Sequence, residues 1–121
     1  MWFEVKSTGD LRTATQTLCK QLEDNLVPHE KVFDCRLVVN ELVGNVLRHS
    51  DGYATMNSVV ADGCVEIYVR SNQATDTFFP PENSVCSSPN AEGGRGLYLV
   101  DSVSVSRSVS PDGEIKVVIK Y

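Results

Sequence analysis

The chain has 121 residues, of which 41% are hydrophobic and 22% charged, a composition typical of a globular domain rather than a disordered segment. Its net charge of −5 and pI of about 4.9 argue against direct binding to nucleic acid, because proteins that bind it carry basic surfaces. No signal peptide opens the sequence, and no apolar run is long enough to span a membrane. We therefore expect one cytoplasmic domain over residues 1–121.

The four cysteines, Cys19, Cys35, Cys64 and Cys86, are widely spaced along the chain. None forms the C-x-x-C pair of zinc ribbons and thioredoxin-like proteins. Four free thiols and two disulfides both fit the number, and we expect free thiols, as is usual in the cytosol.

The first half of the chain predicts one strand and two helices. Residues 3–7 alternate between apolar and polar side chains and predict a strand. Over residues 9–26, leucine and alanine recur at steps of three and four, which indicates an amphipathic helix. Asp10 is the expected N-cap of this helix and Pro28 its expected end. A second helix is expected from about residue 30 to residue 49.

The middle of the chain predicts a hairpin, a long loop and a short helix. Two strand-like runs, 53–61 and 64–70, flank the Asp62-Gly63 dipeptide, which is typical of tight hairpin turns. A polar, proline-rich stretch follows at 71–96, and loops of this length in compact domains are usually functional or mobile. Residues 96–103 predict a short helix.

The C-terminal segments 104–110 and 114–121 predict a closing hairpin. Around the first of these segments, Val103, Val105 and Val109 alternate with serines, so this strand should have one face in water. The predicted helices are segregated from an antiparallel-type sheet along the chain. We therefore expect an α+β fold, a two-layer sandwich of helices and a mixed or antiparallel sheet.

A polar stripe runs along the second predicted helix. Glu41, Asn45 and His49 follow one another at steps of four residues, so they share one side of the helix, at the border of its apolar face. One interpretation is a helix edge where polar groups meet water. The other is a ligand stripe, because carboxylate and amide oxygens suit Mg²⁺ and the imidazole could face an anion.

Glycines gather before the third predicted helix. The segment 92–102 reads EGGRGLYLVDS, with three glycines in four positions. Glycine allows the backbone to approach a ligand closely, and a helix start offers unpaired N–H groups and a positive dipole end. Such a segment is either a phosphate cradle or a flexible entry into the helix.

Taken together, these motifs resemble the GHKL ATPase superfamily, and within it the small bacterial anti-sigma factors and serine-protein kinases. The helix motif of that family, E-x-x-x-N, is similar to Glu41 and Asn45, with His49 one turn further on. Its later G-x-G motif, which precedes an apolar helix, is similar to residues 94–96 followed by 97–100. The resemblance covers nearly the whole chain and implies the Bergerat-type ATP-binding fold.

The resemblance implies an ATP site between the helices and the sheet. Asn45 would hold Mg²⁺, and Glu41 would orient or deprotonate the attacking hydroxyl or water as the catalytic residue. Residues 94–96 would contact the phosphates, and the long loop would form a lid over the nucleotide. The implied cofactor-binding residues are Asn45, His49, Ser71, Gly94, Arg95, Gly96 and Leu97.

One family motif is altered in this chain. The family carries D-x-G-x-G after a central strand, where the aspartate accepts a hydrogen bond from the adenine amino group; here Ser71, Gln73 and Thr75 occupy those positions. A shifted alignment would bring Asp76 to the site instead. Because a hydrogen bond to a charged group contributes about 1.5–3 kcal/mol, its loss would weaken adenine binding roughly ten- to hundredfold.

Three functions follow from this pattern. The first is a regulator that binds Mg-ATP, phosphorylates a serine or threonine of an anti-sigma-antagonist protein, and sequesters a sigma factor. The second is a nucleotide-poor module of the same fold that acts by partner capture alone. The third is an ATPase domain of a two-component sensor, which lacks room here for the dimerisation helices. Homodimers are common in the family that the chain resembles.

Overall fold

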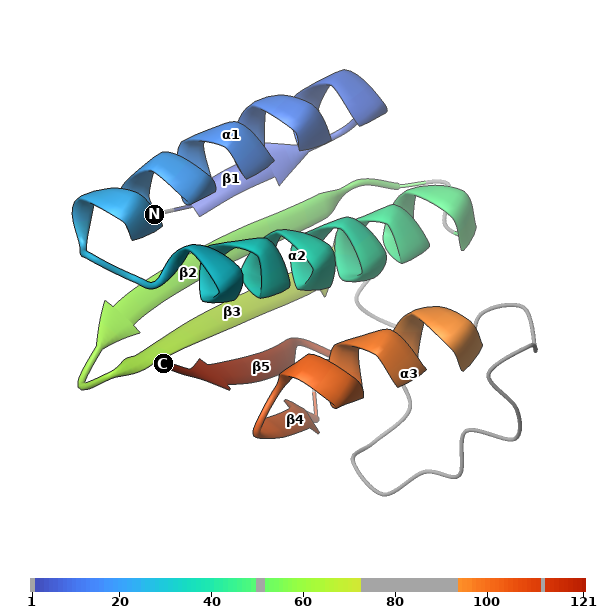
Figure 1. The fold of residues 1–121 in the computed structure, drawn as a ribbon. Helices are drawn as coiled ribbons and strands as arrows, with labels where there is room; N and C mark the ends of the chain where they lie inside the picture. Colours follow the sequence, from blue (N-terminus) through green and yellow to red (C-terminus); the bar gives the residue numbers. More distant parts are fainter. Residues whose placement is uncertain (1, 50–51, 73–93, 112) are drawn as a thin grey trace.

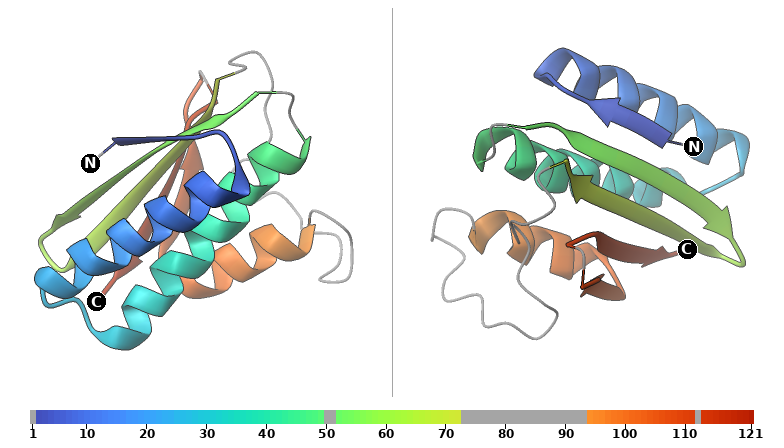
Figure 2. Two further views of the ribbon diagram at one scale, coloured as in Figure 1. Left: turned by 90° about the horizontal axis from the view of Figure 1, so that it is seen from above. Right: turned by 180° about the vertical axis from the view of Figure 1, so that it is seen from behind.

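The computed structural model describes residues 2–49, 52–72, 94–111 and 113–121, and the α+β two-layer sandwich is confirmed (Figure 1). Five antiparallel strands form one sheet in the order β1-β2-β3-β5-β4. Three helices lie side by side on one face of this sheet (Figure 2). The elements are β1 (Trp2–Val5), α1 (Thr8–Asp24), α2 (His29–His49), β2 (Ala54–Ala61), β3 (Cys64–Ser71), α3 (Gly94–Val103), β4 (Ser106–Val109) and β5 (Ile115–Lys120).

The start of α1 differs from the prediction. Ser7 is the N-cap, and its hydroxyl oxygen accepts a hydrogen bond of 3.1 Å from the backbone N–H of Asp10. The Asp10 carboxylate in turn accepts a 3.0 Å hydrogen bond from the backbone N–H of Lys6. Asp10 therefore lies inside the first turn, where its negative charge also suits the positive end of the helix dipole.

The end of α1 is set by Leu26 and not by Pro28. The backbone N–H of Leu26 donates to the carbonyl of Glu23, and that of Val27 donates to the carbonyl of Leu22, each at 3.0 Å. Leu26 has a φ of 62°, so these bonds form a Schellman motif with a leucine where glycine is usual. Pro28 instead precedes the first turn of α2.

The core lies between the sheet and the helices. Helix α2 crosses the middle of the sheet, with α1 on one side and α3 on the other (Figure 1). In β3 and β5, buried and half-buried residues alternate, as expected for strands with one covered face. The largest fully buried side chains are Leu18, Leu22, Leu42, Met56, Ile67, Ile115 and Ile119.

The hairpin between β2 and β3 is confirmed. Asp62 and Gly63 have φ values of 54° and 77°, which is the geometry of a type I′ turn. The backbone N–H of Tyr121 donates to the carbonyl of Gly63 at 2.8 Å, so the C-terminal residue is attached to this turn.

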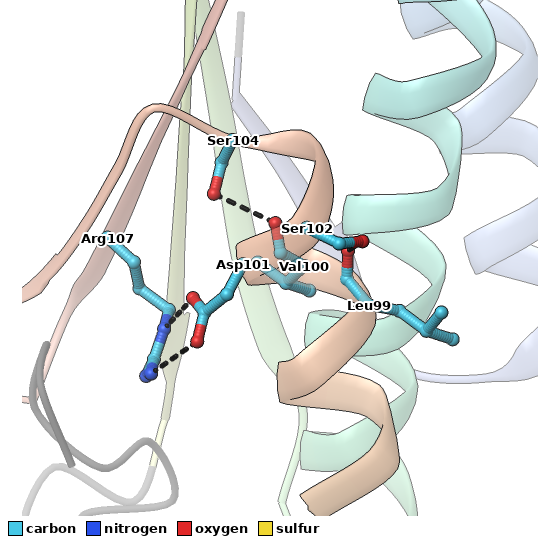
Figure 3. A network of polar contacts seen from close by, with 6 residues as sticks. All are labelled: Leu99, Val100, Asp101, Ser102, Ser104 and Arg107. Carbon is cyan, nitrogen blue, oxygen red and sulfur yellow. Dashed lines mark hydrogen bonds and ion pairs between the residues drawn. The ribbon is translucent and has the colours of Figure 1, made fainter. Parts of the chain in front are cut away.

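The predicted valine face near β4 is confirmed only in part, because Val103 and Val109 pack against the core and Val105 does not. Val105 precedes the strand and its side chain is 62% exposed, whereas Arg107 takes the inward position and is 2% exposed. The Arg107 guanidinium donates from Nε and Nη2 to the two carboxylate oxygens of Asp101 in α3, at 2.7 and 3.1 Å (Figure 3). A two-point, charge-assisted contact of this kind lets a cation occupy a position that the alternation assigns to an apolar residue.

Three of the cysteines, Cys19, Cys35 and Cys64, are free thiols, as predicted, while Cys86 lies outside the described residues. Within the described ranges, no helix is long and apolar enough to cross a membrane.

Candidate functional site

The predicted polar stripe lies on α2. Glu41 and Asn45 are both half-buried, and Leu42 and Val46 beside them are fully buried. The stripe therefore runs along the border of the buried face, as predicted. His49 is the last residue of α2, and its side chain lies outside the described part of the structure.

A guanidinium group lies next to the amide that was predicted to hold Mg²⁺. The Asn45 Oδ1 atom accepts a hydrogen bond of 3.4 Å from Arg48 Nη2. The Arg48 side chain reaches this position across Gly44, because a Cβ atom at Gly44 would lie only 3.0 Å from Arg48 Nη1. A metal ion at Asn45 would have to displace this guanidinium or share the oxygen with it.

The glycine motif begins the neighbouring helix. Gly94 and Gly96 lie in the first turn of α3, which packs against α2. This turn contains no acidic residue, so no carboxylate of its own neutralises the positive end of the helix dipole. The side chains of residues 94–97 lie outside the described part, so the phosphate cradle stays a prediction.

Ser71, at the predicted adenine position, is the last residue of β3 and is paired with Ala54 in β2. It is 4% exposed. The contact between the two strands continues beyond it. The Asn72 backbone N–H donates to the Tyr53 carbonyl at 2.9 Å, and the side-chain Oδ1 of Asn72 accepts from the Tyr53 backbone N–H at 2.6 Å. Gln73, Thr75, Asp76 and the predicted lid all fall outside the described residues.

The fold brings the predicted parts to one end of the molecule. Figures 1 and 2 show the C-terminal end of α2 near the N-terminal end of α3, and β3 runs towards the same end of the molecule. His49, Ser71 and Gly94 are the residues at these three ends. Two segments far apart in the sequence, α2 and α3, thus pack against each other.

No cluster of three or more His, Cys, Asp or Glu side chains suitable for a metal occurs in the described ranges. Asn45 offers one neutral oxygen, a donor that fits Mg²⁺. A magnesium ion there would take its other ligands from water and from phosphate, as this ion commonly does in nucleotide sites.

A network of perturbed ionisable groups lies elsewhere, on the face of the sheet opposite the helices. The Tyr68 hydroxyl donates a 2.6 Å hydrogen bond to Glu66, which lowers the pKa of that carboxyl and raises the pKa of the tyrosine. Lys116 Nζ lies 3.6 Å from the same carboxylate. These residues form a surface network remote from α2 and α3.

A groove that the sequence reasoning missed lies between α1 and α2. Its volume is about 820 Å³, and three cationic side chains, Arg12, Lys20 and Arg36, line it. Neither Glu41 nor Asn45 contributes to it. The helix prediction contained a signal for it, because Arg12 and Lys20 are spaced by two helical turns and so share one polar side of α1.

The resemblance rests on the residues and the order of elements alone. No protein-family model matches the chain, and no curated protein matches it. The arrangement of α2, β3 and α3 is therefore the basis for assigning a function.

Proposed function

We propose that the chain is a partner-switching regulator of the anti-sigma factor type, with serine/threonine kinase activity that uses Mg-ATP on an anti-sigma-antagonist protein. One observation carries the proposal. The half-buried pair Glu41 and Asn45 lies on α2, and the neighbouring helix α3 begins at the glycine turn of residues 94–96.

Each part of this end of the molecule has a role in the proposal. Bound Mg²⁺ would supply charge neutralisation at the phosphates of ATP. Asn45 would provide one oxygen ligand to the ion, and the free N–H groups at the start of α3 would bind phosphate oxygens. Glu41 would accept the proton of the attacking serine or threonine hydroxyl.

The alternative is a catalytically inactive, nucleotide-poor module that acts by sequestering its partner. Two observations favour it. Ser71 has a short, uncharged and buried side chain where the family has an aspartate for adenine, and the Arg48 guanidinium occupies the Asn45 oxygen. Under this alternative the sigma factor or its antagonist is bound without phosphate transfer.

A two-step experiment tests the proposal. The chain is first used as bait in a lysate of its source cell, and recovered proteins are then incubated with it and γ-labelled Mg-ATP. We expect a sigma factor and an antagonist protein to be recovered, and the antagonist to be labelled on serine or threonine. Glu41→Gln should reduce labelling by at least about a hundredfold, because general-base catalysis typically contributes that much or more.

Glu30→Gln is the matched control, because Glu30 is an exposed carboxylate in the first turn of the same helix. Equal labelling by wild type, Glu30→Gln and Glu41→Gln would contradict the kinase role. Recovery of the two partners without any labelling would establish the alternative. Recovery of neither partner would contradict both.

A further inference from the structure

The groove between α1 and α2 lies on the outer side of the helix layer. Arg12 and Lys20 come from α1, and Arg36 and Asn40 come from α2; all four are exposed. Leu18, in contrast, is buried on the opposite side of α1. At about 820 Å³, the groove is as large as clefts that bind ligands in other proteins.

Its cations have no carboxylate partners among the described residues. The ion pairs of the described chain lie elsewhere, and none includes Arg12, Lys20 or Arg36. Glu23 and Asp24 also line the groove, at the C-terminal end of α1, without forming ion pairs. Three positive and two negative side chains give the lining a net charge of +1 in a chain with a net charge of −5. The two carboxylates lie at the C-terminal end of α1, so the rest of the groove suits an anionic ligand.

The spacing of the charges suits an extended or helical segment. Arg12 and Lys20 are eight residues apart, which corresponds to about 12 Å along α1. Arg36 faces them from the other wall. A helix with acidic residues at positions i, i+4 and i+8 spans about the same length, so its carboxylates would reach all three cations.

Two exposed apolar side chains follow or precede lining residues of the groove by two or three positions, although neither lines it. Phe33 is 62% exposed on α2, three residues before Arg36 and on the same side of the helix. Leu26, in the connection between α1 and α2, is 88% exposed. A small polyanion would leave these residues in water. A protein segment would cover them, because aromatic residues are enriched in protein interfaces.

We propose that the groove between α1 and α2 binds an acidic segment of a partner protein that carries an apolar residue next to its carboxylates. The carboxylates pair with Arg12, Lys20 and Arg36, and the apolar residue packs on Phe33. This contact requires no nucleotide, so it is independent of the function proposed above.

A synthetic helical peptide with glutamates at positions i, i+4 and i+8 and flanking leucines is a direct probe. Its binding to the full chain is measured without nucleotide by fluorescence anisotropy, and the contact surface is mapped by NMR shifts of the ¹⁵N-labelled chain. We expect shifts over residues 12–24 and 33–40, and no binding of the peptide in which glutamine replaces glutamate. Affinity should fall as salt rises from about 50 to about 300 mM.

Two matched pairs of variants locate the site. Arg36→Glu should weaken binding at least about tenfold, whereas Lys120→Glu should change it less than about twofold. Lys120 is exposed and follows the buried Ile119 in β5, so it faces away from the helices. Phe33→Ser should also weaken binding, and Val105→Ser should not, although both native side chains are 62% exposed.

Three results would overturn the proposal. The first is an absence of binding at peptide concentrations up to about 1 mM. The second is an equal loss for Arg36→Glu and Lys120→Glu, which would indicate non-specific attraction. The third is displacement of the peptide by tripolyphosphate together with an unchanged affinity of Phe33→Ser, which would indicate a small-anion site. Failure of Mg-ATP to bind would leave all these measurements unaffected.

Discussion

At the scale of single residues, Leu26 stands out because the fold gains nothing from its side chain. Its φ of 62° lies in the left-handed region, and its side chain is 88% exposed. Glycine usually occupies this position of a Schellman motif because it has no Cβ atom to clash with the backbone. This leucine lies two residues after Asp24, which lines the groove, so we include it in the proposed partner surface.

We therefore predict that Leu26→Gly stabilises the protein by up to about 1 kcal/mol, because it relieves the left-handed strain. The free energy of unfolding in urea measures the effect. Lys20→Gly, at an exposed position inside α1, should instead destabilise the protein by about 1 kcal/mol. A loss of stability in Leu26→Gly would show that the leucine contributes to the fold after all.

Cys35 is a second residue whose contribution to the stability of the protein can be measured. Its side chain is fully buried, and burial, reinforced by the charge of Asp34, raises the pKa of the thiol from 9.0 to about 12. The thiol thus stays protonated in the folded state while it ionises above pH 9 in the unfolded chain. Its contribution to stability is complete below pH 9 and is lost as the pH rises towards 12.

We predict that the wild type loses stability between pH 9 and 11 more steeply than Cys35→Ala, by up to about 1.4 kcal/mol per pH unit. Chemical denaturation at a series of pH values gives both curves. The variant should retain a shallower slope, because the pKa of Cys19 and that of Tyr68 are also raised. Parallel curves would show that Cys35 ionises equally in both states.

At the scale of elements, α3 is attached to the edge of the sheet at its C-terminal half. Figure 3 shows the Arg107 guanidinium of β4 against the Asp101 carboxylate of α3. Near the end of the helix, the Ser104 hydroxyl donates to the Val100 carbonyl at 2.8 Å. These contacts fix the helix whose first turn carries the glycine motif.

We predict that Asp101→Ala destabilises the protein by about 1–3 kcal/mol, because it leaves a buried guanidinium without its carboxylate. The Asp101 side chain is 42% exposed, so the loss should stay below that of a fully buried pair. Unfolding in urea measures the change. Asp24→Ala, which removes an exposed carboxylate from the last turn of α1, should change stability by less than about 0.5 kcal/mol. Equal effects of the two substitutions would contradict the role of the pair.

The order and type of all eight elements were predictable, because hydrophobic period and turn residues are local signals. The predictions that failed depend on which side chains contact one another, and a local sequence pattern does not contain this information. Ser7 rather than Asp10 caps α1, since a cap is decided by which side chain reaches the free N–H groups. Arg107 is buried because Asp101, which lies in another element, contacts it. The alternation of residues along the strand does not indicate such a contact.

At the scale of the whole molecule, α2 has two different edges. The edge towards α3 carries Glu41 and Asn45. It was predictable from the spacing of these two residues and from their resemblance to a known motif. The edge towards α1 carries Arg36 and Asn40, which line the groove. The groove was not predicted, because it forms only when two helices pack and their outward side chains converge. A single helix thus separates the proposed nucleotide end from the proposed partner surface.

The central claim is that the end formed by α2, β3 and α3 still binds a nucleotide. Calorimetric titration with Mg-ATP tests it in the wild type, in Asn45→Ala and in Ser71→Asp, with Asn40→Ala as an amide control on the other edge of α2. We expect the wild type to bind weakly and Asn40→Ala to match it. Ser71→Asp should bind at least about tenfold more tightly, because the aspartate would restore a charged acceptor for adenine.

Asn45→Ala should lose at least about tenfold in affinity and its dependence on Mg²⁺. An absence of heat for wild type and Ser71→Asp at nucleotide concentrations of about 1 mM, with Asn45→Ala indistinguishable from both, would contradict the claim.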